Sequence, residues 1–407
     1  MLAASKAAAI PGSGKIVGIS INYGVSPPAI RRLTTSNDPS RLVTVNIMTE
    51  PVPAVGTGAG SSPFDSIYPW SMMEEWNVVD GNVTVKRGHP DFSRTAHDTV
   101  VFLPPFWYCV MDDPVNKLRY YYVSSEPVPG FFPHPGSGRC VGKYNSNSSY
   151  ESRSGFFPVA SITRAAARSG HNDRGARFSN HDFVSCCAIQ LLYFIEYADW
   201  DSQAVIGMGF VNNYPRNAGS GSCDAMTYHT GRPDGADGET GVMYRWIENL
   251  WGNVSDWIDG INVSGKIPFI CTDPANFTED ITDNYISAGL TLPGSGWIAG
   301  YGYTDAFPWS FLPSSTAADR KTFDKAVFGV AHPALKIGGF RLSRDEAGLF
   351  TFDMNTSIDV TGSTSGTRML YLPSESEIER MLAGSDKTDT GVGDATIEPV
   401  RPPAENV

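Results

Sequence analysis

Short apolar runs alternate with polar turns along most of this chain. The runs 16–21 and 42–47 alternate with a period of two residues, which is typical of half-buried strands. The region 77–85 has Asp80-Gly81 between two valine-rich arms, and this dipeptide favours a tight hairpin turn. The pattern predicts further strands at 99–103, 106–110 and 118–123.

Two stretches in the middle of the chain favour helices. One begins near residue 159 and is stopped by Gly170. The stronger one covers 183–197, after Ser179-Asn180 as an N-terminal cap, and it is apolar on nearly every side. The longer helix should therefore lie in the core. Three of its side chains are expected to be almost inaccessible: Ile189, Leu192 and Ile195.

The composition divides the chain into three parts. Residues 1–58 are rich in alanine, proline, serine and valine and should form an attachment or oligomerisation segment, which the glycine-rich linker 55–62 follows. Residues 59–373 are rich in aromatic side chains and strand patterns and should form the main domain. Residues 374–407 should contain a short helix, 374–382, and a disordered acidic tail.

The overall composition favours a folded, loop-rich protein. Hydrophobic residues make up 41% of the chain and charged residues 18%, and there are 41 glycines and 29 prolines. The net charge is −12 and no run is rich in lysine or arginine, so we expect no nucleic-acid partner. No apolar stretch approaches the length of a membrane-spanning helix, so we expect no membrane insertion.

The reactive side chains form no pattern that predicts catalysis or a cofactor. The six cysteines contain no CxxC pair, and we interpret them as buried thiols, with a Cys140–Cys223 disulfide as the alternative. The seven histidines form no HxH or HxxxH pair, and no carboxylate spacing singles out an acid and a base. We therefore expect no enzyme, no catalytic residue, no cofactor and no metal.

One acidic, glycine-rich loop leaves an alternative to that expectation. Residues 221–239 contain four side chains that could offer ligands to a divalent cation such as calcium: Asp224, His229, Asp234 and Asp237. Such loops are common in chains of this composition, so a solvated loop is the favoured interpretation.

Several motifs of this chain resemble one protein family. Residues 249–260, NLWGNVSDWIDG, look like the N-x-x-GNVWEW-x-D-G signature of C-type-lectin-like domains of the formylglycine-generating-enzyme type. Gly338-Gly339, the AGLF of 347–350 and the GTRMLYLP of 366–373 are similar to the C-terminal region of phage variable proteins diversified by retroelements. Further similar segments are 104–108, 201–207, 296–303 and 309–314. The similarity covers about 61–373.

The resemblance implies a fold and excludes one activity. The implied fold is α+β, a C-type-lectin-like domain with short strands, long loops and two packed helices, preceded by a small β-rich N-terminal segment. Asn253 should bond neighbouring backbone groups while Trp251 and Trp257 fill the core. No cysteine follows Cys271, whereas the formylglycine-generating enzymes need reactive cysteines late in the domain, so that activity is not expected here.

The resemblance also implies a function in a virion. The chain would be a receptor-binding protein of a phage tail or fibre, made in the bacterial cytoplasm, with a host-cell receptor (protein or glycan) and other virion proteins as partners. By family analogy it would be a homotrimer. The alternative is a structural decoration protein whose domain binds nothing. An enzyme acting on cell-surface glycans has no clear support in the residues.

The polar interval between Phe340 and Thr364 is the expected display surface, because this interval carries the binding surface in the family and short polar side chains suit adaptable hydrogen bonding. Composition alone would favour an ordinary solvated loop. Seven side chains are expected to project from one exposed face: Arg341, Arg344, Asp345, Thr351, Asn355, Asp359 and Ser363. Tyr303 and Trp309 should lie nearby as aromatic anchors, and Ser343 is a further expected binding residue.

Overall fold

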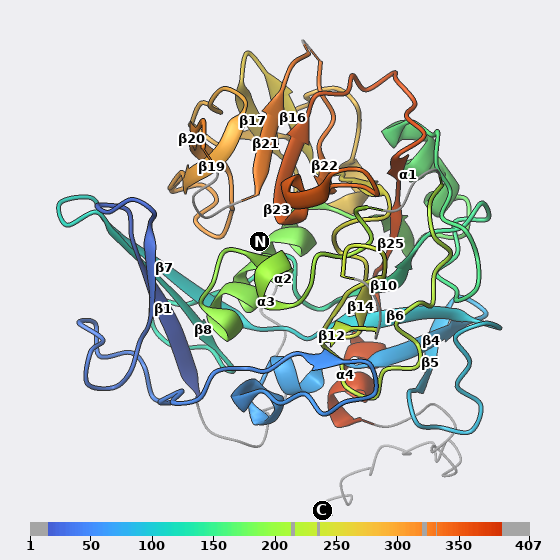
Figure 1. Ribbon diagram of the computed structural model, residues 1–407, viewed down its shortest axis with the longest axis horizontal. Helices are drawn as coiled ribbons and strands as arrows, with labels where there is room; N and C mark the ends of the chain where they lie inside the picture. The colour runs from blue at the N-terminus through green and yellow to red at the C-terminus, as the bar shows by residue number, and fades with distance from the viewer. Residues whose placement is uncertain (1–14, 213–215, 234–236, 320–323, 331, 385–407) are drawn as a thin grey trace, which may run out of the picture.

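Strands dominate the computed structural model of this chain (Figure 1). It describes residues 15–212, 216–233, 237–319, 324–330 and 332–384. Among these described residues strands hold 33% and helices 14%, in five sheets and four α-helices. The expectation of an α+β fold with two packed helices is therefore wrong, and the chain has a β-rich fold with few helices. The difference arises because only one helix is long and apolar enough to be a core element, while the remaining core comes from sheets.

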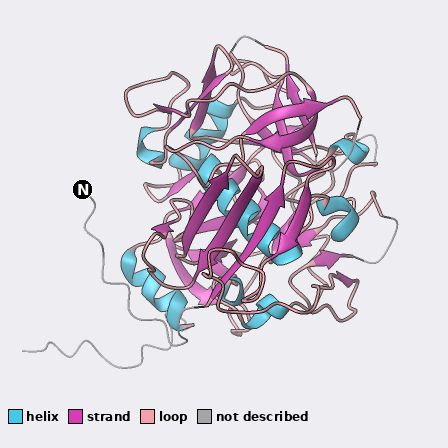
Figure 2. Ribbon diagram, turned by 90° about the vertical axis from the view of Figure 1, so that its left-hand side faces the viewer, coloured by secondary structure: helices cyan, strands magenta, loops and turns pink. Residues whose placement is uncertain are grey.

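The first sheet, which lies on the left of Figure 1 and faces the viewer in Figure 2, contains the N-terminal strand at its second position. Its order is β2 (Ala29–Arg32), β1 (Ile16–Asn22), β8 (Leu118–Ser124), β7 (Trp107–Asp113) and β9 (Phe132–Pro133). Strand β1 pairs antiparallel with β2 and β8. Ile19 and Ile21 of β1 are completely buried in the main core. The described part of the N-terminal segment thus packs into the same core as the rest of the chain.

The second sheet contains the predicted hairpin. Its order is β11 (Phe178–Asn180), β25 (Arg368–Tyr371), β10 (Arg139–Asn145), β6 (Asp98–Leu103), β4 (Glu75–Val79) and β5 (Asn82–Lys86). Asp80 and Gly81 join β4 to β5 with φ of 51° and 74°, as a primed hairpin turn requires. The hairpin prediction is confirmed, as are the strands predicted near 99–103, 106–110 and 118–123.

The third large sheet carries much of the C-terminal region. Its order is β20 (Pro313–Ala317), β19 (Gly296–Tyr301), β21 (Lys325–Phe328), β23 (Gly348–Met354), β22 (Lys336–Gly338), β15 (Ser255–Trp257) and β24 (Ser365–Gly366). Two small sheets complete the described fold. One contains β14 (Ile247–Glu248), β13 (Met243–Tyr244), β12 (Gly231–Arg232) and β3 (Ala54–Val55), and the other β16 (Ile261–Ser264), β17 (Ile267–Ile270) and β18 (Ile286–Ser287).

Helix α2 (Phe183–Tyr197) lies in the interior of the molecule, and every one of its residues is buried. Ile189, Leu192 and Ile195 are at most 1% exposed, which confirms the expectation from the sequence. The cap is Asp182 rather than Ser179-Asn180: its carboxylate accepts from Ser185 N at 2.9 Å, and the two earlier residues belong to β11.

The other helices are short. They are α1 (Arg164–Asn172), α3 (Ser202–Val205) and α4 (Glu375–Ala383), with single 3-10 turns η1 (Pro63–Ser66), η2 (Trp70–Met72), η3 (Pro274–Asn276) and η4 (Arg344–Glu346). Helices α1 and α4 match two helices predicted from the sequence, with boundaries shifted by a few residues. None of the helices in the described ranges has the length and apolar character needed to cross a membrane.

Two predictions for the N-terminal region are wrong. Residues 42–47 form no regular strand, although Thr44 N donates to the Ile16 carbonyl at 3.0 Å beside β1. The segment 55–62 is not a free linker, because Gly56 N donates to the Arg232 carbonyl and β3 pairs with β12. Glycine content alone therefore misjudged a segment that long-range backbone hydrogen bonds hold in place. The predicted tail from 385 onward and residues 1–14 lie outside the described residues.

Candidate functional site

Asn253 fixes the loop beneath the expected display surface. Asn253 is 1% exposed, and its backbone φ is 61°. Its Oδ1 accepts from Ala218 N at 2.8 Å, and its Nδ2 donates to Ala218 O at 3.1 Å. Trp251 and Trp257 are completely buried. The structural role predicted for this motif is confirmed, since the asparagine satisfies backbone groups and the tryptophans fill the core.

Gly338 allows the next segment to approach this loop closely. Its φ is 82°, and a Cβ atom on it would lie 2.5 Å from the Leu250 carbonyl oxygen. Any side chain would therefore collide with the backbone here. Arg341 N then donates to the Asn253 carbonyl at 3.0 Å. The loop after β22 thus begins from a tightly fixed position.

Arg368, on β25, joins three parts of the chain from the interior. Its guanidinium is fully buried, and Nε donates to Asp256 Oδ2 at 2.9 Å. The remaining nitrogens donate to four backbone carbonyls at 2.9–3.0 Å, those of Gly142, Lys143, Glu248 and Asn249. Asn145 Nδ2 donates to the other oxygen of Asp256 at 2.8 Å. These buried charges are fully engaged with the protein, which gives them a structural role.

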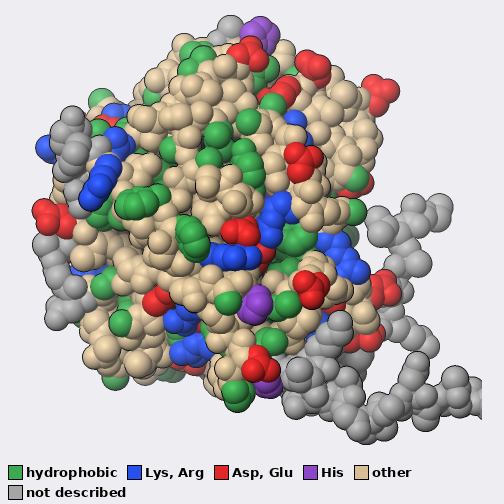
Figure 3. Space-filling model, turned by 90° about the vertical axis from the view of Figure 1, so that its right-hand side faces the viewer, with side chains coloured by type: hydrophobic (Ala, Val, Ile, Leu, Met, Phe, Trp, Pro, Cys, Tyr) green, Lys and Arg blue, Asp and Glu red, His purple; other side chains and the backbone are tan. Residues whose placement is uncertain are grey.

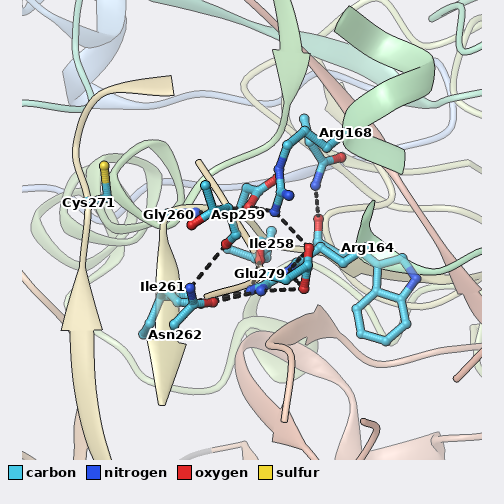
Figure 4. Close-up of polar contacts among 12 residues, drawn as sticks. Arg164, Arg168, Ile258, Asp259, Gly260, Ile261, Asn262, Cys271 and Glu279 are labelled. Atoms are coloured by element: carbon cyan, nitrogen blue, oxygen red, sulfur yellow. Dashed lines mark hydrogen bonds and ion pairs between the residues drawn. The ribbon is translucent and has the colours of Figure 1, made fainter. Parts of the chain in front are cut away.

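A second ion-pair cluster ties α1 to the β16 region (Figure 4). Arg164 donates to Glu279 Oε2 at 2.7 Å and to the Ile261 carbonyl at 2.8 Å. Arg168 donates to Asp259 Oδ2 at 2.7 Å and to Glu279 Oε1 at 2.8 Å. Burial alone would raise the pKa of Glu279, but the two arginines outweigh this effect and hold the pKa below its usual range. Glu279 is therefore held ionised by its two arginine partners.

The loop 340–346 presents charged side chains on a fixed backbone. Arg344 and Asp345 are exposed at its 3-10 turn, η4, while Ser343 is half-buried. The backbone is held because Gln203 Nε2 donates to the Arg344 carbonyl at 2.9 Å and Ser343 Oγ accepts from Phe340 N at 2.9 Å. Arg344 and Asp345 line a surface hollow of about 490 Å³. Met208 and Asn212 form its other side.

Three further expected residues lie beyond the opposite end of β23. Asn355, Asp359 and Ser363 are exposed, and Gly362 O accepts from Ser161 N at 3.1 Å. Strand β23, which separates this group from Asp345, has seven residues and so spans roughly 20 Å. The residues expected on one face therefore fall into separate groups.

Trp309, Arg341 and Thr351 are not exposed, which corrects the expectation for these residues. Trp309 is 4% exposed and packs against Phe183 of α2 at 6.0 Å between ring centroids. Arg341 and Thr351 are 8% and 5% exposed. Thr351 points inward because it lies in the middle of β23, where packing rather than polarity decides burial. Trp309 is consequently a core residue and no surface anchor.

Tyr303 is not among the residues that line the hollow beside Arg344. It is half-buried, and the Arg119 guanidinium carbon is 5.4 Å from its ring centroid. Arg119 Nε donates to Asp112 Oδ1 at 2.8 Å, and the same arginine lines a cavity of about 430 Å³ between the β7–β8 hairpin and strands β19 and β20. The structure therefore does not bring Tyr303 together with the rest of the expected surface.

The sequence analysis missed an exposed aromatic pair, Phe156 and Phe157, which are 45% and 60% exposed. A Phe-Phe pair between glycine and proline fits a buried turn equally well, so no sequence signal separated the two outcomes. Met208 and Asn212 were also missed, because their partners lie more than a hundred residues away along the chain.

The cysteines and the acidic loop show no second site in the described residues. All six cysteines are free thiols, so the Cys140–Cys223 disulfide is absent; Cys109 is half-buried and the other five are buried. Burial raises the pKa of Cys140 and Cys223. Asp224 accepts from Ser154 Oγ at 2.5 Å, whereas Asp237 pairs with Arg232 at 3.1 Å, so the two carboxylates have separate partners. Asp234 lies outside the described residues.

Comparisons with protein-family models and with curated proteins find no match to this chain. The loop 340–346 is the best candidate for a binding site. Its exposed charged side chains lie on a backbone that the buried Asn253 loop holds in place.

Proposed function

We propose that this chain is a receptor-binding protein of a phage virion rather than an enzyme, and that the loop 340–346 forms part of its binding surface. The observation that carries the proposal is the contrast between exposed side chains and fixed backbone at Arg344 and Asp345. A surface that is ordered before binding loses less conformational entropy when a partner binds. The sequence resemblance to phage variable proteins supports the virion as the setting.

The hollow beside this loop supports a partner that makes both polar and apolar contacts. Arg344 and Asp345 offer a donor and an acceptor, while Met208 contributes an apolar, adaptable side chain. Arginine is enriched among residues that dominate interface energetics. We propose a receptor on a bacterial surface as the partner.

The test is binding of the fluorescently labelled chain to a panel of bacterial strains. The variant Arg344→Ala/Asp345→Ala keeps the net charge. It should bind at least about 10-fold more weakly than the parent chain to a strain that the parent chain binds. The matched control is Arg31→Ala/Asp283→Ala, which removes one exposed residue of each kind from β2 and from the loop before β18. Equal binding by the variant and the control would contradict the proposal and favour a decoration protein.

We further propose that the N-terminus attaches the chain to other virion proteins and that it assembles as a homotrimer. Removal of all 58 residues would not test this cleanly, because β1 is part of the core. Deletion of residues 1–14 leaves β1 intact and should abolish incorporation into particles while the melting temperature stays unchanged. Normal incorporation of that deletion would contradict attachment through the N-terminus. Sedimentation of the full chain checks the trimer.

A further inference from the structure

Phe156 and Phe157 are apolar side chains held in solvent by a fixed turn. Ser220 N donates to the Phe156 carbonyl at 2.8 Å, and Ser220 Oγ donates to the Arg153 carbonyl at 2.6 Å. Gly155 N donates in turn to Ser220 O at 3.0 Å. Because hydrogen bonds hold the backbone on both sides of the pair, the fold itself keeps the two rings in solvent, and we take them as a candidate interaction site.

Hydrogen bonds connect this turn to both halves of the interval 340–364. Next to Ser220, Ala218 bonds Asn253, whose carbonyl accepts from Arg341 N at 3.0 Å. On the other side of the turn, Ser161 N donates to Gly362 O at 3.1 Å. The segment before α1 lies on the right of Figure 1, and Figure 3 shows that this side exposes hydrophobic side chains next to lysine or arginine side chains.

Arg216 adds a positive charge to the aromatic pair. Its side chain is exposed, and its guanidinium carbon lies 5.9 Å from the centroid of the Phe157 ring. A guanidinium over an aromatic face is preoriented and still presents donors to a carboxylate. The three side chains together form an apolar knob with a cationic edge, which we call the aromatic knob.

We propose that the aromatic knob, Phe156, Phe157 and Arg216, anchors the chain to a protein receptor by filling an apolar pocket that has a carboxylate at its rim. This inference rests on the proposed receptor-binding function and names the partner class. Phenylalanine has no polar atom, so it gains most from a pocket that removes it from water. The arginine contributes a charge-assisted hydrogen bond to a carboxylate on that rim.

Other occupants fit these observations less well. A net charge of −12 opposes attraction to an anionic membrane. A glycan presents hydroxyl groups whose hydrogen bonds phenylalanine cannot satisfy. A protein pocket is the partner that matches both the rings and the guanidinium.

The test compares Phe156→Ala/Phe157→Ala with Phe132→Ala on a bacterial strain that the full chain labels. Phe132, on β9, is 61% exposed and serves as the matched control. The double variant should bind about 30-fold more weakly or worse, the loss expected for one aromatic hot spot, with an unchanged melting temperature. Phe132→Ala should bind like the parent chain. Arg216→Ala should weaken binding less and make it less sensitive to salt.

The outcomes separate this inference from the proposed function. Binding should disappear when the cells are treated with protease, and persist after periodate oxidation of their glycans. The inference is overturned if Phe156→Ala/Phe157→Ala binds normally while Arg344→Ala/Asp345→Ala does not, and the proposed function then stands. Binding to phosphatidylglycerol vesicles that depends on the two phenylalanines, or binding that survives protease, overturns it too. If the full chain labels no strain, both proposals fail.

Discussion

Arg368 and Arg344 lie 24 residues apart and have opposite environments. Arg368 is completely buried and donates to Asp256 and to four backbone carbonyls. Arg344 is exposed at a surface hollow, and Gln203 donates a hydrogen bond to its backbone carbonyl. The interior region thus uses polar side chains to fix backbone segments, while the loop region uses fixed backbone to present polar side chains.

This difference shows that the residue type alone does not tell whether a polar side chain of the C-terminal region supports the fold or faces solvent. The exposed positions can change without removing a contact on which the core depends, whereas the buried ones cannot. A protein that must bind varied partners benefits from this separation, because the binding surface then changes without loss of the fold. The predictions below test whether the two regions separate in this way.

The largest effect is expected for Arg368→Ala. The change leaves the Asp256 carboxylate buried without its ion-pair partner and removes the Arg368 donors from four backbone carbonyls. Loss of one partner from a buried pair costs about 3–5 kcal/mol. The free energy of unfolding in denaturant should fall by at least that much. A loss below about 1 kcal/mol would show that the buried arginine does not brace the fold.

Truncation within α2 should have the next largest effect. Leu192 is completely inaccessible, so Leu192→Ala removes methyl groups from a packed core and should cost about 2–5 kcal/mol. Thermal melting checks this. The control is Leu342→Ala in the loop region, where the side chain is 43% exposed and the change should be small. Similar melting by both variants would contradict the placement of α2.

The interior region should also respond to acid. Burial, with a nearby arginine in each case, lowers the pKa of His134, His171 and His181 to about 3. In the unfolded chain these histidines take up protons below about pH 6.5, whereas the folded chain resists protonation until about pH 3. Each of these histidines should therefore lower the free energy of unfolding by about 1.4 kcal/mol per pH unit as the pH falls from about 6.5 towards 3.

Unfolding in denaturant at pH 7, 6 and 5 measures this loss. The variant His171→Gln lacks one of the three groups, so its stability should fall less steeply with pH than that of the parent chain. Equal slopes for the two proteins would contradict the assignment of a buried, neutral His171.

The smallest effect on stability is expected in the loop region. Arg344→Ala/Asp345→Ala should change the free energy of unfolding by within about 0.5 kcal/mol, because both side chains are exposed. A loss above about 2 kcal/mol would show that the loop supports the fold and would remove the contrast between the regions.

Local sequence patterns predicted the elements that local interactions determine. The Asp80-Gly81 turn, helix 183–197 and the bonding role of Asn253 depend on backbone preference, helix periodicity and a motif, and all three are confirmed. The fold class was wrong because strand pairing joins residues far apart, as β10 with β25 or β3 with β12. No pattern within a short window contains such pairs.

The expected site failed in part for the same reason. Thr351 and Trp309 have the residue types of an interaction surface, but their neighbours in space bury both. Phe156 and Phe157 have the residue types of a core and are exposed. Exposure is a property of the folded chain, and the residue type predicted it poorly at these four positions.

The central proposal is that the exposed loop 340–346 binds a receptor, while the inward-facing residues of the interval 340–364 support the fold. The most direct measurement substitutes every position of this interval and scores each variant for folding and for binding to a labelled bacterial strain. Variants at the exposed positions should fold normally: Arg344, Asp345, Asn355, Asp359 and Ser363. Those at Arg344 and Asp345 should lose binding. Variants at Thr351 should lose folding. The proposal is contradicted if every exposed position tolerates substitution with unchanged binding.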